Sequence, residues 1–156
     1  MLFRSPHSIL LDARAHIHLY EAGGVAFHSQ ANSLAIPPSN GHHLTLEDVE
    51  ANIVRGDDIH GAPTKIVALE NTLSGTIFPQ DEIIRISEKM REEGVIMHCD
   101  GARMWEVVAK TGMELEELCR PFDTVSLCMS KGLGAPIGRY VLPFRPSRFP
   151  RLTSPR

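Results

Sequence analysis

The sequence has few cysteines and no long hydrophobic run, and both shortages exclude whole classes of protein. Its three cysteines, at positions 99, 119 and 128, are odd in number and lack the spacing of metal ligands. Apolar runs fall short of the roughly 18 residues that a membrane helix needs, and no secretory signal is evident. We therefore expect reduced cysteines, a cytoplasmic location, no metal site and no membrane partner.

Excess charge of one sign is also lacking. The formal net charge of -3 gives no reason to expect a nucleic-acid partner. The 156 residues, of which 42% are hydrophobic and 22% charged, fit one soluble globular domain with room for a core.

Short apolar runs alternate with helical patterns over the second half of the chain. Strands joined by such helices imply a parallel sheet covered by helices on both faces, which is an α/β fold. Strands are expected at 65–69, 95–99 and 124–129, and helices at 80–93, 103–110 and 115–119.

The first half of the chain is less regular. Thr45 followed by Asp48 is an acidic variant of the capping box and predicts a helix to about residue 54. Residues 15–24 suit a short helix, and residues 25–36 suit a strand and a loop. The pattern predicts no element for residues 1–12.

Polar side chains follow three of the expected strands. Glu70, Asp100 and Lys131 come directly after the runs 65–69, 95–99 and 124–129. Because the carboxyl ends of parallel strands meet at one edge of a sheet, where ligands bind, we expect these side chains to share that edge.

Each of these side chains has two interpretations. Lys131, between an apolar strand and a glycine-rich turn, is either a solvated loop lysine or an amine made nucleophilic by partial desolvation or a nearby cation. Asp100 is either the N-cap of the helix that starts near Arg103 or the partner of a protonated ring nitrogen. Glu70 is either part of a helix cap or a group that orients a neighbour.

The second interpretation of Lys131 and Asp100 points to one cofactor. A lysine that forms a Schiff base and a carboxylate that keeps a pyridine nitrogen protonated are what pyridoxal 5'-phosphate (PLP) needs. Arg103 could present its planar guanidinium to the carboxylate of an amino-acid substrate.

Four segments in order, AHIHLYEAGG, LENTLSGTIFP, HCDGARMW and SLCMSKGLGAPIG, resemble the low-specificity L-threonine aldolases of the β-eliminating lyase family, which are fold-type I PLP enzymes. The resemblance implies that Lys131 is the Schiff-base lysine, that Asp100 pairs with the pyridinium and that Arg103 lies near the cofactor and the substrate carboxylate. It also implies that His16 stacks on the pyridine ring and that His60 lies near the substrate β-hydroxyl, so both histidines are candidate bases.

The same resemblance implies an activity and an assembly. The expected fold is a partial PLP-dependent transferase-like large domain, and the expected reaction cleaves L-threonine or L-allo-threonine to glycine and acetaldehyde. Members of the family form homodimers or homotetramers. Two alternatives stay open: an amino-acid (alanine) racemase of the same family, and an inactive paralogue.

The chain departs from the family pattern at both ends. A fold-type I enzyme is about twice this long, and neither the glycine/threonine phosphate-binding turn nor the C-terminal small domain is recognisable, so we expect a truncated protein with impaired activity. The catalytic domain is expected over residues 1–138. Residues 139–156, with five arginines and four prolines, are expected to form a disordered tail.

Overall fold

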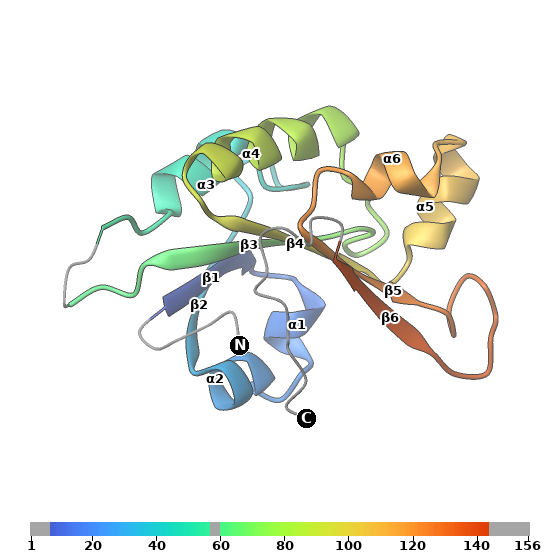
Figure 1. Cartoon of the computed structure of the whole chain (residues 1–156), viewed down its shortest axis with the longest axis horizontal. Helices are drawn as coiled ribbons and strands as arrows, with labels where there is room; N and C mark the ends of the chain where they lie inside the picture. Colours follow the sequence, from blue (N-terminus) through green and yellow to red (C-terminus); the bar gives the residue numbers. More distant parts are fainter. Residues whose placement is uncertain (1–6, 57–59, 144–156) are drawn as a thin grey trace, which may run out of the picture.

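The computed structural model describes residues 7–56 and 60–143, and these form one six-stranded sheet with helices on both sides (Figure 1). The strands lie in the order β2-β1-β3-β4-β5-β6. They are β1 His7–Asp12, β2 Ala31–Ile36, β3 Thr64–Glu70, β4 Ile96–Gly101, β5 Thr124–Cys128 and β6 Arg139–Pro143. The helices are α1 His16–Leu19, α2 Gly24–Ser29, α3 Leu46–Asn52, α4 Gln80–Glu92, α5 Met104–Thr111 and α6 Leu115–Cys119.

The first five strands are parallel, and only β6 runs antiparallel to its neighbour within the described ranges. Strands β3, β4 and β5 and helices α4, α5 and α6 fall where the sequence predicts them, with ends shifted by at most two residues. The α/β fold is therefore confirmed.

Two separate hydrophobic clusters show why helices are needed on both faces of the sheet. The larger cluster lies under α3 to α6 and includes Leu10, Val67, Met97, Val125 and Phe122, all at most 1% exposed. A smaller cluster on the other face lies against α1 and α2, which contribute Ile17 and Val25 to it. Alternate residues of β1 and β3 therefore belong to opposite cores, as expected for strands covered on both faces.

Two elements in the first half of the chain differ from the sequence-based expectations. Strand β1, in a segment with no predicted element, lies inside the sheet between β2 and β3. Helix α2 occupies the first part of residues 25–36, where a strand and a loop were expected, and β2 follows it. Helix α2 buries none of its residues, so it has no hydrophobic period for a sequence pattern to detect.

Residues 139–143 correct the expected boundary of the tail. They form β6, an edge strand paired with β5 from Cys128↔Arg139 to Thr124↔Pro143. Proline is tolerated there because an edge strand has one side that makes no ladder hydrogen bonds. Residues 144–156 lie outside the described residues.

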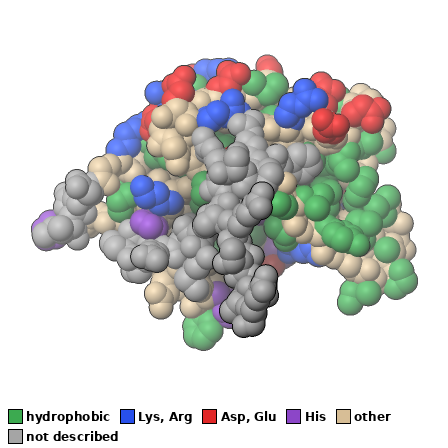
Figure 2. Space-filling view, viewed as in Figure 1, with side chains coloured by type: hydrophobic (Ala, Val, Ile, Leu, Met, Phe, Trp, Pro, Cys, Tyr) green, Lys and Arg blue, Asp and Glu red, His purple; other side chains and the backbone are tan. Residues whose placement is uncertain are grey.

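The outer surface differs between the two ends of the molecule. Figure 2 shows Lys, Arg, Asp and Glu side chains side by side along the top, over α3 and α4, where Arg85 pairs with both Glu47 and Glu82. Hydrophobic side chains gather on the side of β6, where Ile137 is 88% exposed and Val141 63%. None of the helices in the described ranges has the length and apolar character to cross a membrane.

Helix α3 begins with the predicted capping box. The Thr45 hydroxyl accepts from the Asp48 N–H at 3.2 Å, and the Asp48 carboxylate accepts from the Thr45 N–H at 2.9 Å. Two backbone donors that the helix itself leaves unpaired are thereby satisfied.

We predict that Thr45→Ala lowers the free energy of unfolding by about 1 kcal/mol, because the N-cap acceptor is lost. Thr45→Ser keeps the hydroxyl and should keep most of the stability. Urea unfolding followed by circular dichroism measures both variants. Equal stabilities for the alanine and serine variants would show that the capping contact is not stabilising.

Candidate active site

The carboxyl edge of the sheet brings together side chains that are far apart in sequence. Glu70 at the end of β3 is the register partner of Asp100 on β4, and Lys131 follows the next strand, β5. The charges of Asp100, Lys131 and His16 all act on the Glu70 carboxyl. The expected sharing of one edge is therefore observed for Glu70, Asp100 and Lys131, and His16 lies beside Glu70 at that edge.

Asp100 is buried, with a side chain only 6% exposed. Its Oδ1 accepts from the Ala102 N–H at 3.1 Å and lies 3.4 Å from the Ser126 hydroxyl. It does not cap α5, whose N-cap is Arg103 and has no side-chain cap, so that interpretation of Asp100 is wrong. A buried carboxylate needs a cation or several donors, and Arg139 Nη2 lies 3.4 Å from Asp100 Oδ2.

Lys131 lies on the turn that joins β5 to β6 and is exposed. Its carbonyl accepts from the Gly134 N–H at 2.8 Å, which closes the turn. The next residue, Gly132, packs so closely on α5 that an added Cβ would lie 2.8 Å from the Glu106 carboxyl carbon. The lysine is thus exposed on a turn that is itself held against the domain.

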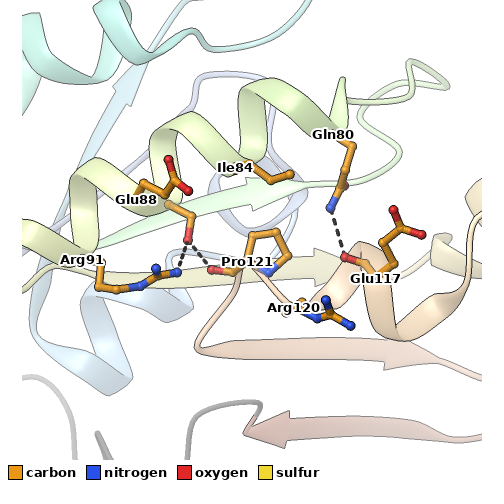
Figure 3. A pocket seen from close by; sticks show the side chains of 8 residues that line it. Gln80, Ile84, Glu88, Arg91, Glu117, Arg120 and Pro121 are labelled. Carbon is orange, nitrogen blue, oxygen red and sulfur yellow. Dashed lines mark hydrogen bonds between the residues drawn. The ribbon is translucent and has the colours of Figure 1, made fainter.

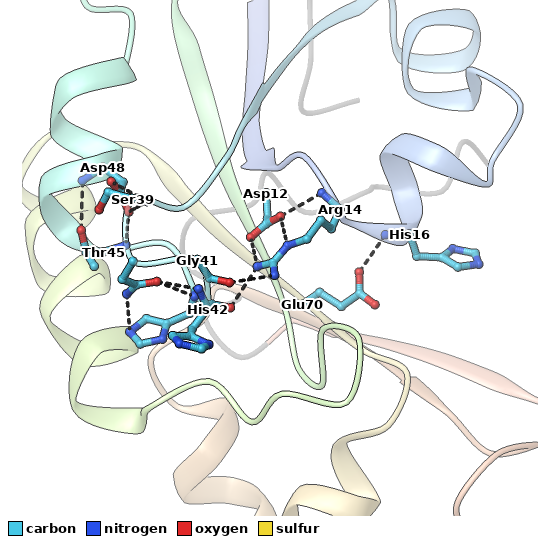
Figure 4. A network of polar contacts seen from close by, with 11 residues as sticks. Asp12, Arg14, His16, Ser39, Gly41, His42, Thr45, Asp48 and Glu70 are labelled. Carbon is cyan, nitrogen blue, oxygen red and sulfur yellow. Dashed lines mark hydrogen bonds and ion pairs between the residues drawn. The ribbon is translucent and has the colours of Figure 1, made fainter.

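Glu70 anchors the start of α1. Its Oε2 accepts from the backbone N–H of His16 at 2.8 Å, as Figure 4 shows. Burial raises the pKa of the Glu70 carboxyl, and the neighbouring Asp100 charge raises it further, whereas the His16 N–H and the Lys131 charge act in the opposite direction. Glu70 therefore orients a neighbour, as the second interpretation proposed, and also satisfies a helix-start donor.

The His16 side chain lies over the same edge and is about half exposed. Its Nδ1 is 3.2 Å from Glu21 Oε1, and its ring is tilted against Tyr20 with centroids 5.3 Å apart. In a neutral ring, the proton on Nδ1 is the one that Glu21 accepts, which leaves Nε2 able to take a proton.

The pair Asp12 and Arg14 was missed, because no element is predicted for residues 1–12. Asp12 ends β1 at the same edge, and Arg14 donates to both of its oxygens at 3.0 and 2.8 Å. Arg14 also donates to the carbonyls of Gly41 and His42, so it ties the loop after β2 to the end of β1 (Figure 4). The hydrogen bond with Asp12 raises the pKa of the Arg14 guanidinium.

Of the remaining predicted site residues, Arg103 lies close to Asp100 and His60 lies at the opposite edge of the sheet. Arg103, in the loop between β4 and α5, is exposed close after Asp100. His60 precedes the amino end of β3, at the opposite edge of the sheet from Lys131. Seven strand residues at about 3.3 Å each separate the two edges by roughly 20 Å, so the structure does not bring His60 together with the others. The roles of both residues stay predictions.

A pocket elsewhere on the molecule is not this site. It lies between α4 and the loop after α6, bridged by hydrogen bonds from Ser87 to the Pro121 carbonyl and from Gln80 to the Glu117 carbonyl (Figure 3). None of the predicted site residues is among those that line it.

The mostly parallel sheet, covered by helices on both faces and carrying an amine and a buried acid at its carboxyl edge, defines the large-domain fold of the fold-type I enzymes. The family model for beta-eliminating lyases matches residues 1–147, so the chain belongs to the beta-eliminating lyase family.

Individual proteins that resemble this chain are consistent with this family assignment. The chain is 54% identical over 139 residues to the low-specificity L-threonine aldolase of Candida albicans, covering 88% of this chain and 37% of that protein. It is 42% identical over 137 residues to the alanine racemase TOXG of Cochliobolus carbonum, covering 88% of this chain and 35% of that protein. A solved threonine aldolase of Leishmania major superposes with a TM-score of 0.85 at 22% identity, covering 96% of this chain and 44% of that one, which shows a shared fold.

We predict that the stability difference between the wild type and Glu70→Gln depends on pH. The folded state binds the Glu70 proton more tightly than the unfolded state does, so this contribution is fully present below the unfolded pKa of about 4.3. It is lost as the pH rises through the folded pKa. Urea unfolding at several pH values should therefore show the wild type losing stability relative to the variant as the pH rises above about 4.

Glu88→Gln, an exposed change on α4, is the matched control for Glu70→Gln. A wild-type-minus-variant difference with the same pH dependence for both substitutions would contradict the effect assigned to burial of Glu70.

Proposed function

We propose that this chain carries the cofactor-binding core of a PLP-dependent aldehyde lyase that cleaves L-threonine and L-allo-threonine to glycine and acetaldehyde. The observation that carries the proposal is the placement of a buried acid, Asp100, at the carboxyl end of β4 and of an exposed amine, Lys131, after the adjacent parallel strand β5. The names of the similar threonine aldolases support the substrate. The chain spans little more than a third of those relatives, so the activity is proposed for the protein to which this core belongs.

The donor set at the edge fits PLP chemically. Asp100 supplies a buried carboxylate, which is the acceptor that a protonated ring nitrogen needs, and Lys131 supplies a primary amine for the aldehyde carbon. When bound, PLP supplies an electron sink for the electron pair of a bond broken at the substrate α-carbon.

The chain's own residues would then hold the cofactor, bind the substrate and accept a proton from it. Asp100 holds a proton on the ring nitrogen, and Lys131 keeps the cofactor at the edge. Arg103, exposed beside this edge, binds the substrate carboxylate with its planar guanidinium. His16, with Nδ1 directed to Glu21, takes the β-hydroxyl proton at Nε2. We assign no step to His60 within a single chain, because it lies at the opposite edge of the sheet.

The relatives include one named as an alanine racemase, which favours racemisation as a second candidate function. Both reactions use Lys131 and Asp100, so the edge geometry alone does not separate them. Release of acetaldehyde from threonine supports the lyase, and loss of optical rotation from L-alanine without aldehyde supports the racemase.

We also propose a cytoplasmic homo-oligomer. Support for assembly comes from exposed apolar side chains on α1, α2 and the β5–β6 region, of which Tyr20, Phe27 and Ile137 are 71%, 80% and 88% exposed. Support for a reducing compartment comes from three free cysteines, of which Cys99 and Cys119 are buried.

We predict that PLP followed by borohydride labels the peptide that contains Lys131. The label should vanish in Lys131→Ala and persist in Lys110→Ala, an exposed lysine on α5 that serves as the matched control. Peptide mass spectrometry measures both, whether or not the chain cleaves threonine. Labelling of Lys131→Ala at the wild-type level would refute Lys131 as the attachment point.

A further inference from the structure

Strand β6 places an arginine against the acid of the candidate active site. Arg139 Nη2 lies 3.4 Å from Asp100 Oδ2 and donates to the Ser126 hydroxyl at 2.7 Å. Among the described residues, it is the cation that pairs with Asp100. Its side chain is 49% exposed whereas that of Asp100 is 6% exposed, so the arginine reaches inward from the edge strand to a buried charge.

The sheet register explains how Arg139 reaches Asp100. Asp100 pairs with Ser126 across β4 and β5, and Arg139 pairs with Cys128 across β5 and β6. Residues 126 and 128 point to the same face, because side chains alternate along a strand. Asp100, Ser126 and Arg139 therefore form a row across three strands on one face, with the Ser126 hydroxyl bridging the two charges.

A second, partly buried group is influenced by the charges of both Asp100 and Arg139. His98 lies two residues before Asp100 on β4, and its Nδ1 is 2.8 Å from the Thr124 hydroxyl. Burial lowers the pKa of His98, the Asp100 charge raises it, and the Arg139 charge lowers it. The guanidinium thus lies close enough to this face of β4 to influence both side chains.

From this geometry we infer that Arg139 competes with the cofactor ring for Asp100. In the chain without cofactor, the guanidinium neutralises the buried carboxylate. A protonated ring nitrogen needs the same carboxylate, and two cations at one acid repel each other. The ring must therefore displace Arg139, and the affinity for the cofactor is reduced by the free energy of the Arg139–Asp100 contact.

This inference rests on the proposed function, because Asp100 is assigned there as the partner of the ring nitrogen. A suitable probe is pyridoxamine 5'-phosphate, which has the same ring nitrogen but no aldehyde and so forms no bond with Lys131. Its affinity reports pairing with the ring independently of attachment to the lysine.

We expect Arg139→Gln to lower the dissociation constant of pyridoxamine 5'-phosphate about tenfold, since a charge-assisted contact no longer competes for the acid. Fluorescence titration measures the constant. Lys110→Gln, which removes one positive charge from an exposed position on α5, is the matched control and should change it less than about twofold. Unchanged affinity for Arg139→Gln, or no binding to either protein, would overturn the inference.

A double-substitution cycle tests whether the effect passes through Asp100. In the Asp100→Asn background, Arg139→Gln should give no further gain, because the shared partner is gone. An equal gain in both backgrounds would show that Arg139 acts elsewhere and would overturn the inference. Circular dichroism checks folding. If Arg139→Gln is unfolded, Arg139→Lys replaces it, and its lack of a planar fork should give a smaller gain of the same sign.

Failure of the two proposals can be told apart. Labelling of Lys131 by PLP with unchanged pyridoxamine 5'-phosphate affinity in Arg139→Gln rejects the competition and keeps the proposed function. Tighter pyridoxamine 5'-phosphate binding by Arg139→Gln without any labelling of Lys131 keeps the competition and rejects the role of the lysine.

Discussion

A negative charge buried at the end of a strand has to be neutralised, and the Asp100 carboxylate is the charge on which the arrangement of this edge depends. It is only 4% exposed, on the central strand β4, where water cannot stabilise it well. Which cation pairs with the Asp100 carboxylate therefore distinguishes the cofactor-free site from the cofactor-bound site. A guanidinium from the same chain satisfies the carboxylate without a cofactor, and a pyridinium satisfies it with one.

Three neighbouring strands, β1, β3 and β4, each carry a carboxylate at or next to their last residue, and each carboxylate has a different partner. Asp12 receives a two-pronged contact from Arg14, which fixes a loop. Glu70 receives a backbone N–H from His16, which is a weaker compensation, and burial raises its pKa. Asp100 receives Arg139 from an edge strand.

The second half of the fold could be predicted from the sequence because its strands are short apolar runs separated by helices of clear period. The shared edge of Glu70, Asp100 and Lys131 followed from parallel pairing alone. Strand β1 could not be predicted, because an isolated apolar run of this length fits a strand or a buried helix equally well. Its position is fixed by pairing with β2 and β3, which lie far along the chain.

The contact between Arg139 and Asp100 could not be predicted either. It depends on the chain turning back as an antiparallel edge strand, and the arginines and prolines after residue 138 indicated a tail instead. The position of His60 was predictable, since it precedes the strand expected at 65–69 and residues before parallel strands lie at the opposite edge from Lys131. Asp100 and Lys131 were predictable because each lies close to the carboxyl end of an apolar run in the sequence.

The most direct test is nitrogen NMR of PLP labelled with ¹⁵N in its ring and bound to the chain at saturation. A pyridinium held by a buried carboxylate should show the chemical shift of a protonated nitrogen in the wild type and that of a neutral nitrogen in Asp100→Asn. The same ring-nitrogen shift in both proteins would contradict the role given to Asp100.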